Sequence, residues 1–177
     1  MLRNLFRGLS LLFVLLLASC VRAQTVPPRL ETGYRELDKK LSQLISADEH
    51  AISAIEARKL STAIFLDARE KEEYTVSHLP SAIHLGYNSP DYDQLEEIDK
   101  SRPVVVYCTV GYRSERAAKK LRQLGFSQVY NLYGSIYAWK LAGLPLNDAA
   151  GKSTEKVHTY SRKWGSFVPD SIGEKVW

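Results

Sequence analysis

Apolar residues in the second half of the chain form a compact pattern of strand, loop and helix. The run at 104–107 is continuously β-branched and aromatic, which predicts a strand buried on both faces. Apolar residues then recur at helical spacing, and Gly125 lies where a helix usually stops. Ser114 is a suitable N-cap for this helix. A tight loop at 108–113 therefore joins the predicted strand to the predicted helix.

Similar alternation predicts the rest of the fold. Ser53 and Glu56 have the spacing of a capping box, so a short helix should begin there. Further strands are predicted at 63–66, 82–85 and 129–132, and helices at 33–46, 53–60, 70–76, 90–99 and 136–142. Strands alternating with helices at short spacing predict an α/β fold, with a central parallel sheet covered by helices on both faces. In such sheets the functional site lies at the carboxyl ends of the strands.

The loop after the central strand carries the strongest chemical signal. Cys108 ends the strand and faces a helix N-terminus, where backbone N–H groups and the helix dipole stabilise a thiolate. Gly111 allows a tight loop, and Arg113 adds a permanent positive charge. We predict Cys108 as a catalytic nucleophile, with its substrate-binding loop formed by Thr109, Val110, Gly111, Tyr112 and Arg113. The alternative is a buried structural cysteine.

The N-terminus is typical of an export signal. Arg3 and Arg7 precede an apolar run at 9–18, which is too short for a comfortable membrane span. Residues 17–20, Leu-Ala-Ser-Cys, resemble a bacterial lipobox, in which Cys20 is lipidated. Cleavage after Ala23 is the alternative, and the complete match at 17–20 favours the lipobox. We therefore expect a protein exported to the bacterial periplasm or cell envelope, anchored to a membrane through Cys20 or otherwise soluble in the periplasm.

Charge and cysteine content limit the classes of function. The formal net charge of +4 becomes +2 when residues 1–19 are removed with Arg3 and Arg7, so nothing favours nucleic-acid binding. On either cleavage pattern Cys108 is the sole free thiol of the mature chain, since the sequence holds only two cysteines. A single thiol in an exported protein indicates reactivity or intermolecular pairing.

The chain divides into four predicted segments. Residues 1–19 are the signal peptide, and 20–32 form a linker that contains two prolines. Residues 33–146 form the α/β domain with its N-terminal helix, and 147–177 form a C-terminal extension. The extension is polar but rich in aromatic residues, so we expect it to pack on the domain rather than remain disordered.

Several ordered motifs together resemble the rhodanese family. They are LDAREKEEYTVSHLPSAIHL at 66–85, YCTVGYRSERAAKKLRQLGF from Tyr107, and NLYGSIYAWKLAGLPL ending at Leu146. The resemblance covers about 52–146 and implies the family's three-layer α/β fold. It also implies a cysteine that carries a persulfide, which falls on Cys108, and an Asp-x-Arg element, which falls on Asp67 and Arg69.

The sequence departs from the family at a few backbone positions. Ser77 and Ser81 flank the His-x-Pro turn where the family often has glycine, and the later Gly-Gly pair is Gly134-Ser135. We expect local changes of backbone shape there.

The resemblance implies a two-step sulfur transfer. Cys108 takes a sulfane sulfur from thiosulfate or a persulfide and passes it to a thiol, cyanide or a protein cysteine. The alternatives are a persulfide carrier that needs a protein partner, and a cysteine phosphatase or arsenate reductase. The Cys-x4-Arg spacing of this loop is one residue shorter than the usual phosphatase spacing, which favours sulfur over phosphate.

Supporting roles are predicted around the loop. Asp67, Arg69 and Ser114 should hold the site's geometry, with Arg69 available to pair with Glu73. His78 is expected to be a hydrogen-bonded turn residue. The histidines show no metal-ligand spacing with Cys108, so we expect no metal, and no cofactor is implied.

Overall fold

The computed structural model describes residues 26–177. The predicted signal peptide, the lipobox, Cys20 and the alternative cleavage position after Ala23 lie outside the described residues. Within 26–177, no helix combines the length and the apolar character needed to cross a membrane.

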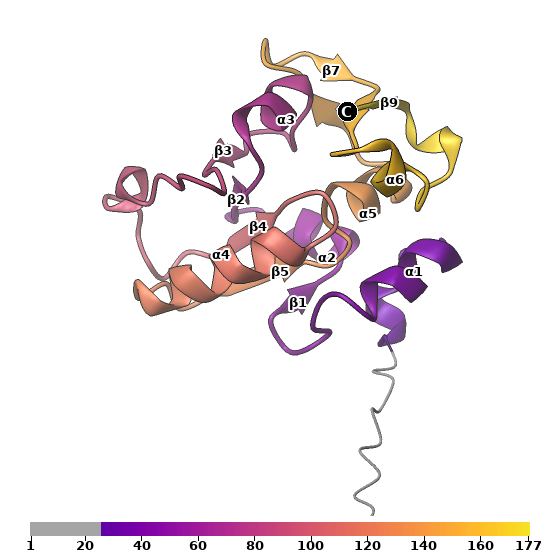
Figure 1. Ribbon diagram of the computed structural model, residues 1–177. Coiled ribbons are helices and arrows are strands. Elements are labelled where there is room, and N and C mark those ends of the chain that lie inside the picture. Colours follow the sequence, from indigo (N-terminus) through magenta and orange to yellow (C-terminus); the bar gives the residue numbers. More distant parts are fainter. Residues whose placement is uncertain (1–25) are drawn as a thin grey trace, which may run out of the picture.

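A five-stranded sheet lies at the centre of the fold (Figure 1). Its strand order is β1-β5-β4-β2-β3, and every pairing is parallel. This confirms the predicted α/β architecture with a central parallel sheet. The strands are β1 (Ala51–Ile52), β2 (Ile64–Asp67), β3 (Ile83–His84), β4 (Val104–Tyr107) and β5 (Val129–Leu132). The patterning did not predict β1, because two residues are too few to show a period.

Helices cover both faces of this sheet. Successive side chains of β4 point to opposite faces, so the strand contributes to a core on each side. Val104 and Val106 pack with Leu121 of α4 (Tyr112–Gln123) on one face. Val105 and Tyr107 belong to the larger core on the other face. That core includes residues of α1 (Arg35–Leu41), α2 (Ala54–Lys59) and α5 (Ser135–Leu141). The fully apolar central strand predicted from the sequence is thus buried on both sides.

Two of the smaller predicted helices form as expected. Ser53 and Glu56 make the capping box at the start of α2, with the Ser53 amide donating to the Glu56 carboxylate at 2.9 Å. The predicted turns at 70–76 form α3 (Lys71–Val76). Local capping chemistry is visible in sequence because its partners lie only three residues apart.

Three helix predictions need correction. The helix expected at 33–46 is shorter and ends at Leu41. The helix expected at 90–99 is only a 3-10 turn, η2 (Asp93–Leu95), since the Gln94 side chain donates to the Asp91 carbonyl and locks a turn. Ser114 is not an N-cap, because α4 begins at Tyr112 with Gly111 in the capping position.

The segment before α1 also packs on the domain. A 3-10 turn, η1 (Pro28–Leu30), buries Leu30 in the larger core. The Arg29 guanidinium donates to the carbonyl of Ala51 at 2.9 Å, which ties this turn to the edge strand β1. The end of the predicted linker is therefore part of the folded structure.

The C-terminal residues fold against α5 and α3 (Figure 1). The Tyr137 hydroxyl on α5 donates to the carbonyl of Thr159 at 3.2 Å, and Val157 and Val168 enter the larger core. The elements are β6 (Leu146–Asn147) with β7 (Ser153–Thr154), β8 (Lys156–His158) with β9 (Glu174–Val176), α6 (Arg162–Gly165) and η3 (Asp170–Ile172). A tail that places apolar side chains in the core holds a fixed position over the rest of the fold.

Candidate active site

Cys108 lies at the carboxyl end of β4, where the parallel sheet predicts a site. The residue is only 1% exposed and forms the floor of a cavity of about 330 Å³. Aromatic and apolar side chains dominate the walls, which are Leu44, Tyr87, Thr109, Val110, Tyr112, Arg113, Tyr160 and Trp164. The predicted loop residues Thr109, Val110, Tyr112 and Arg113 therefore all line this cavity, while Gly111 contacts the sulfur through its amide.

The environment of the Cys108 sulfur favours the thiolate. Burial raises the pKa of the thiol, but the Arg113 charge and the amides of Ser114 and Gly111 outweigh it, so the net pKa is lowered. The Gly111 amide donates to the Sγ atom at 3.1 Å. A thiolate at the start of a twelve-residue helix also gains from the helix dipole. These groups stabilise the thiolate form of Cys108 despite its burial.

The backbone at position 111 strongly favours glycine. Its φ of 120° lies in the region that side chains rarely adopt, and an added Cβ would lie 2.7 Å from the Ile45 Cδ1 atom. Asn131 on β5 fixes the loop by donating to the Gly111 carbonyl at 3.1 Å, and it accepts from the Ser114 hydroxyl at 2.7 Å. Ser114 therefore supports the loop from within the helix. Asn131 was missed, although an amide in an apolar buried strand is a detectable signal.

Ser135, one of the departures from the family pattern, is a second support of the loop. Its hydroxyl accepts from the Cys108 amide at 3.0 Å and lies 4.0 Å from the sulfur. Both Ser135 and Ser81 have left-handed backbone, with φ of 50° and 60°. Glycine adopts this conformation more readily than serine, and the expected change of backbone shape relative to the family stays a prediction.

Arg113 is held by an acidic partner on α3. Its guanidinium donates to both carboxylate oxygens of Glu73, at 2.6 and 2.8 Å, and to the Thr109 hydroxyl at 2.9 Å. The predicted Arg69–Glu73 pair is wrong, because Glu73 takes Arg113 instead. Forty residues separate these two side chains, so only the fold brings them together.

Asp67 and Arg69 form a separate, fully buried pair. The Arg69 Nε atom donates to Asp67 at 2.9 Å, and a terminal nitrogen donates to the Ser77 carbonyl at 2.6 Å. The pair therefore ties the end of β2 to the end of α3. It fixes the helix that carries Glu73, and this supports the structural role predicted for both residues.

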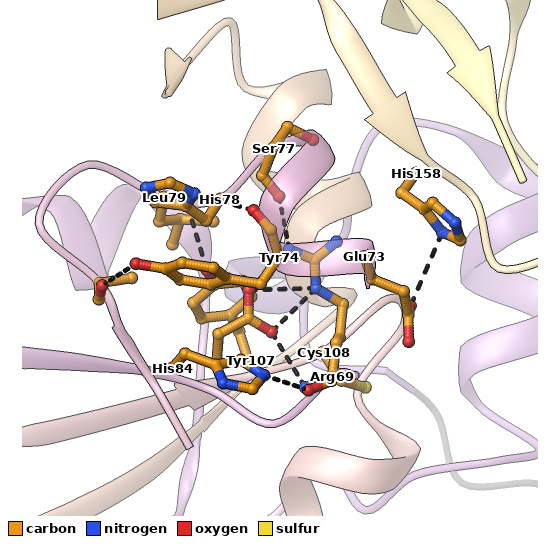
Figure 2. A network of polar contacts seen from close by, with 12 residues as sticks. Arg69, Glu73, Tyr74, Ser77, His78, Leu79, His84, Tyr107, Cys108 and His158 are labelled. Carbon is orange, nitrogen blue, oxygen red and sulfur yellow. Dashed lines mark hydrogen bonds and ion pairs between the residues drawn. The ribbon is translucent and has the colours of Figure 1, made fainter. Parts of the chain in front are cut away.

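Of the histidines near the site, His78 and His84 contact backbone carbonyls, and His158 lies 3.9 Å from the Glu73 carboxylate (Figure 2). The His78 Nδ1 atom lies 3.0 Å from the Tyr74 carbonyl, as expected for a turn histidine. His84 lies 2.9 Å from the Arg69 carbonyl, a partner that the sequence did not indicate. Among residues 26–177, no three His, Cys, Asp or Glu side chains gather closely enough to hold a metal ion.

Several cavity walls come from outside the motif region. Leu44 follows α1, Tyr87 follows β3, and Tyr160 and Trp164 belong to the C-terminal extension. The sequence signalled the extension only through its density of aromatic residues. It could not indicate which rings would reach Cys108, because that depends on how the extension folds back.

Comparison with known proteins identifies the family. The model of the rhodanese-like domain matches residues 47–142, more than half of the chain. The chain belongs to the rhodanese-like domain family. It is 35% identical over 98 residues to thiosulfate sulfurtransferase GlpE of Coxiella burnetii, a match that covers 55% of this chain and 90% of that protein.

Other relatives and solved structures agree on the fold. A tRNA uridine(34) hydroxylase of Sodalis glossinidius is 32% identical over 136 residues, which cover 70% of this chain and 37% of the hydroxylase. The crystal structure of BH2092 from Bacillus halodurans aligns with a TM-score of 0.51 at 25% identity, over 66% of this chain and 84% of that one. The rhodanese-like domain of Alr3790 from Anabaena gives 0.52 at 24% identity, over 57% and 80%.

Proposed function

We propose that this protein is a sulfurtransferase that carries sulfane sulfur on Cys108. The observation that carries the proposal is the set of groups around its sulfur: the Gly111 amide at 3.1 Å, the Arg113 charge and a cavity that opens onto the thiol. The lowered pKa of Cys108 supplies the thiolate that attack on sulfur requires. The match to thiosulfate sulfurtransferase GlpE over most of that protein supports the same chemistry.

The proposed reaction has two balanced steps. The Cys108 thiolate attacks the outer sulfur of thiosulfate, the sulfur–sulfur bond of the donor breaks, and sulfite leaves with the electron pair. With a persulfide as donor, a thiolate leaves instead. A second nucleophile, which is cyanide, a thiol or a protein cysteine, then takes the outer sulfur and returns Cys108 to its thiolate.

Asp67, Arg69 and Ser114 have positioning roles in this proposal. Asp67 and Arg69 hold the end of α3. The Ser114 hydroxyl donates to the Asn131 side chain, which in turn donates to the Gly111 carbonyl. The loop amides and Arg113 would stabilise the persulfide anion by fixed dipoles and charge.

Intact mass measurement tests the proposal. Wild-type protein should gain one sulfur atom after thiosulfate or an organic persulfide, and cyanide should remove it. Cys108→Ser should gain none while retaining the circular dichroism spectrum of the wild type. Ser135→Ala is the matched control, because it alters a support of the loop and leaves the thiol in place. Sulfur loading on Cys108→Ser would show that another residue carries the sulfur.

A persulfide carrier is the second candidate, favoured by the burial of Cys108. An exposed fraction of only 1% limits the access of solvent nucleophiles to the Cys108 sulfur. The two functions differ in turnover. Repeated discharge to small acceptors supports an enzyme, whereas stable loading that discharges only to a protein cysteine supports a carrier.

For the N-terminal region, we propose export to the bacterial cell envelope and attachment through a lipid on Cys20. The apolar run at 9–18 and the lipobox sequence at 17–20 support this proposal. Cys20→Ser should move the protein from the membrane fraction to the soluble fraction. Cys108→Ser serves as the control for loss of a thiol, and an unchanged membrane fraction for Cys20→Ser would reject the anchor.

A further inference from the structure

The cavity above Cys108 is completed by residues outside the family match. The family model ends at residue 142, but Tyr160 and Trp164 line the cavity from the C-terminal extension. On the other side Leu44 lies before the start of the match at residue 47. The flanking segments of this chain thus decide what can approach the sulfur.

The extension is fixed firmly enough to shape a binding site. Thr159 is fully buried, and its amide donates to the Val176 carbonyl at 2.7 Å. Its own carbonyl accepts from Tyr137 at 3.2 Å. The Ser161 hydroxyl accepts from the Trp164 amide at 3.3 Å, which caps the turn that carries the indole. Both aromatic walls therefore start from a well-anchored backbone.

Tyr160 has a strained backbone that directs its ring to the cavity. Its φ of 64° is left-handed, which a residue with a bulky side chain rarely adopts. The Tyr160 amide donates to the His158 Nδ1 atom at 3.1 Å, so this nitrogen is an unprotonated acceptor. Such strain persists only where the surrounding structure imposes it, and it is concentrated at functional sites.

The positive charge of Arg113 at the cavity wall is already paired with Glu73. Apart from the Cys108 thiolate, Arg113 is the one charged residue among the described residues that line the cavity, and both of its terminal nitrogens contact the Glu73 carboxylate. The Tyr160 ring lies over the Arg113 guanidinium at 5.2 Å, and the Tyr87 ring lies near it at 5.9 Å. The remaining walls are aromatic or aliphatic, apart from Thr109, which bonds to Glu73 and Arg113.

We infer that the cavity takes a small organic thiol with an apolar group about the size of an aromatic ring. This inference rests on the proposed sulfurtransferase function and names its acceptor class. A cavity of about 330 Å³ has the size of a small-molecule site, and its walls offer burial of apolar surface rather than a free charge. The apolar group packs between Tyr160 and Trp164 and brings its sulfur to Cys108.

The transfer step balances without a further reactant. The acceptor thiolate attacks the outer sulfur of the Cys108 persulfide and forms the organic persulfide. The bond between that sulfur and Sγ breaks, and its electron pair remains on Cys108 as the thiolate. No net oxidation occurs, so the reverse reaction makes the apolar organic persulfide a sulfur donor.

Acceptor competition tests this inference. Purified protein is loaded with sulfur and then mixed with 2-phenylethanethiol, ethanethiol, 3-mercaptopropionate or cyanide, while intact mass follows discharge. We expect kcat/KM for 2-phenylethanethiol to exceed that for ethanethiol by about tenfold or more, since apolar groups in a pocket discriminate on this scale. The anionic 3-mercaptopropionate should be no better than ethanethiol.

Variants locate the preference in the extension. Tyr160→Gly removes the ring but accepts the left-handed backbone, and Trp164→Ala removes the indole. Each should lower the ratio of kcat/KM for 2-phenylethanethiol to kcat/KM for ethanethiol several-fold. Tyr160→Phe, which keeps a ring, should retain most of this ratio. Trp177→Ala is the matched control, because this aromatic residue of the extension is exposed and does not line the cavity. It should keep the ratio of the wild type.

The outcomes separate the two proposals. Failure to load sulfur from any donor rejects the sulfurtransferase function and this inference with it. Loading and discharge to cyanide without a preference for 2-phenylethanethiol rejects only the inference. A preference that survives both Tyr160→Gly and Trp164→Ala, or discharge only to reduced thioredoxin, also overturns it.

Discussion

Arg113 on α4 and Glu73 on α3 form a two-bonded ion pair beside the Cys108 sulfur, with nitrogen–oxygen distances of 2.6 and 2.8 Å. Both side chains are largely buried, at 13% and 4% exposed. The pair holds the cationic guanidinium in one place and limits its availability to a bound anion. It thus connects the stability of the domain to the ionisation of its thiol.

Replacement of Arg113 should raise the pKa of Cys108. Burial by itself raises this pKa, and the Arg113 charge is the largest of the opposing effects. In Arg113→Gln the rate of iodoacetamide alkylation should therefore rise only at higher pH than in the wild type. Arg116→Gln is the control, because Arg116 is exposed and lies over the Tyr112 ring outside the cavity. An unchanged alkylation profile in Arg113→Gln would contradict the assigned effect.

Glu73→Gln should destabilise the protein in a pH-dependent way. Burial raises the pKa of Glu73, but Arg113 and other partners lower it overall below 4.5. A carboxylate with a depressed pKa contributes stability above its unfolded value, and this is lost as the pH falls through the folded-state value. At neutral pH urea unfolding should show a loss of about 3 kcal/mol, since Arg113 is left without its charge partner.

The same experiment has a control on the same helix. Glu72→Gln changes an exposed carboxylate and should alter stability by less than about 0.5 kcal/mol. The difference between wild type and Glu73→Gln should shrink as the pH falls below 4.5. A constant difference across that range would mean that the ion pair is not the source of the stability.

Gly111→Ala should damage both stability and thiol reactivity. The φ of 120° and the contact of 2.7 Å with Ile45 make the substitution cost about 2 kcal/mol, and relaxation would move the amide that donates to the sulfur. Gly143→Ala is the control, because it has a φ of 72° but nothing within 4 Å of its added Cβ. It should cost about 1 kcal/mol and leave alkylation of Cys108 unchanged. Equal reactivity in the two variants would argue against a role for the Gly111 amide.

Asp67→Asn should be among the most destabilising polar substitutions. The Asp67–Arg69 pair is fully buried, so removal of one charge leaves the other unpaired in the interior. Urea unfolding should show a loss of about 3–5 kcal/mol. Glu155→Gln breaks a pair of similar length with Lys140, but the Glu155 side chain is 77% exposed, and the loss should be below about 1 kcal/mol. A comparable loss in the two variants would contradict the importance of burial.

Local patterns account for much of what could be predicted. The central strand, its loop and the capping box of α2 depend on residues close together in sequence, and each was found where expected. An incorrect helix prediction also came from a local pattern. At 90–99 the apolar spacing was compatible with a helix, but hydrogen bonds of Gln94 favoured a turn.

The sequence by itself determined the parallel α/β order and the position of Cys108 at a strand end, because periodicity and motif spacing are properties of short segments. Tertiary structure decided which charges pair: Glu73 takes Arg113, while Asp67 takes Arg69. It also decided that Tyr160 faces the thiol cavity from the end of the chain. Asp67 and Arg69 lie only two residues apart, but Glu73 and Arg113 are separated by forty residues, as Tyr160 is by more than fifty from Cys108. These long-range contacts depend on how helices and strands pack, and no local pattern encodes that choice.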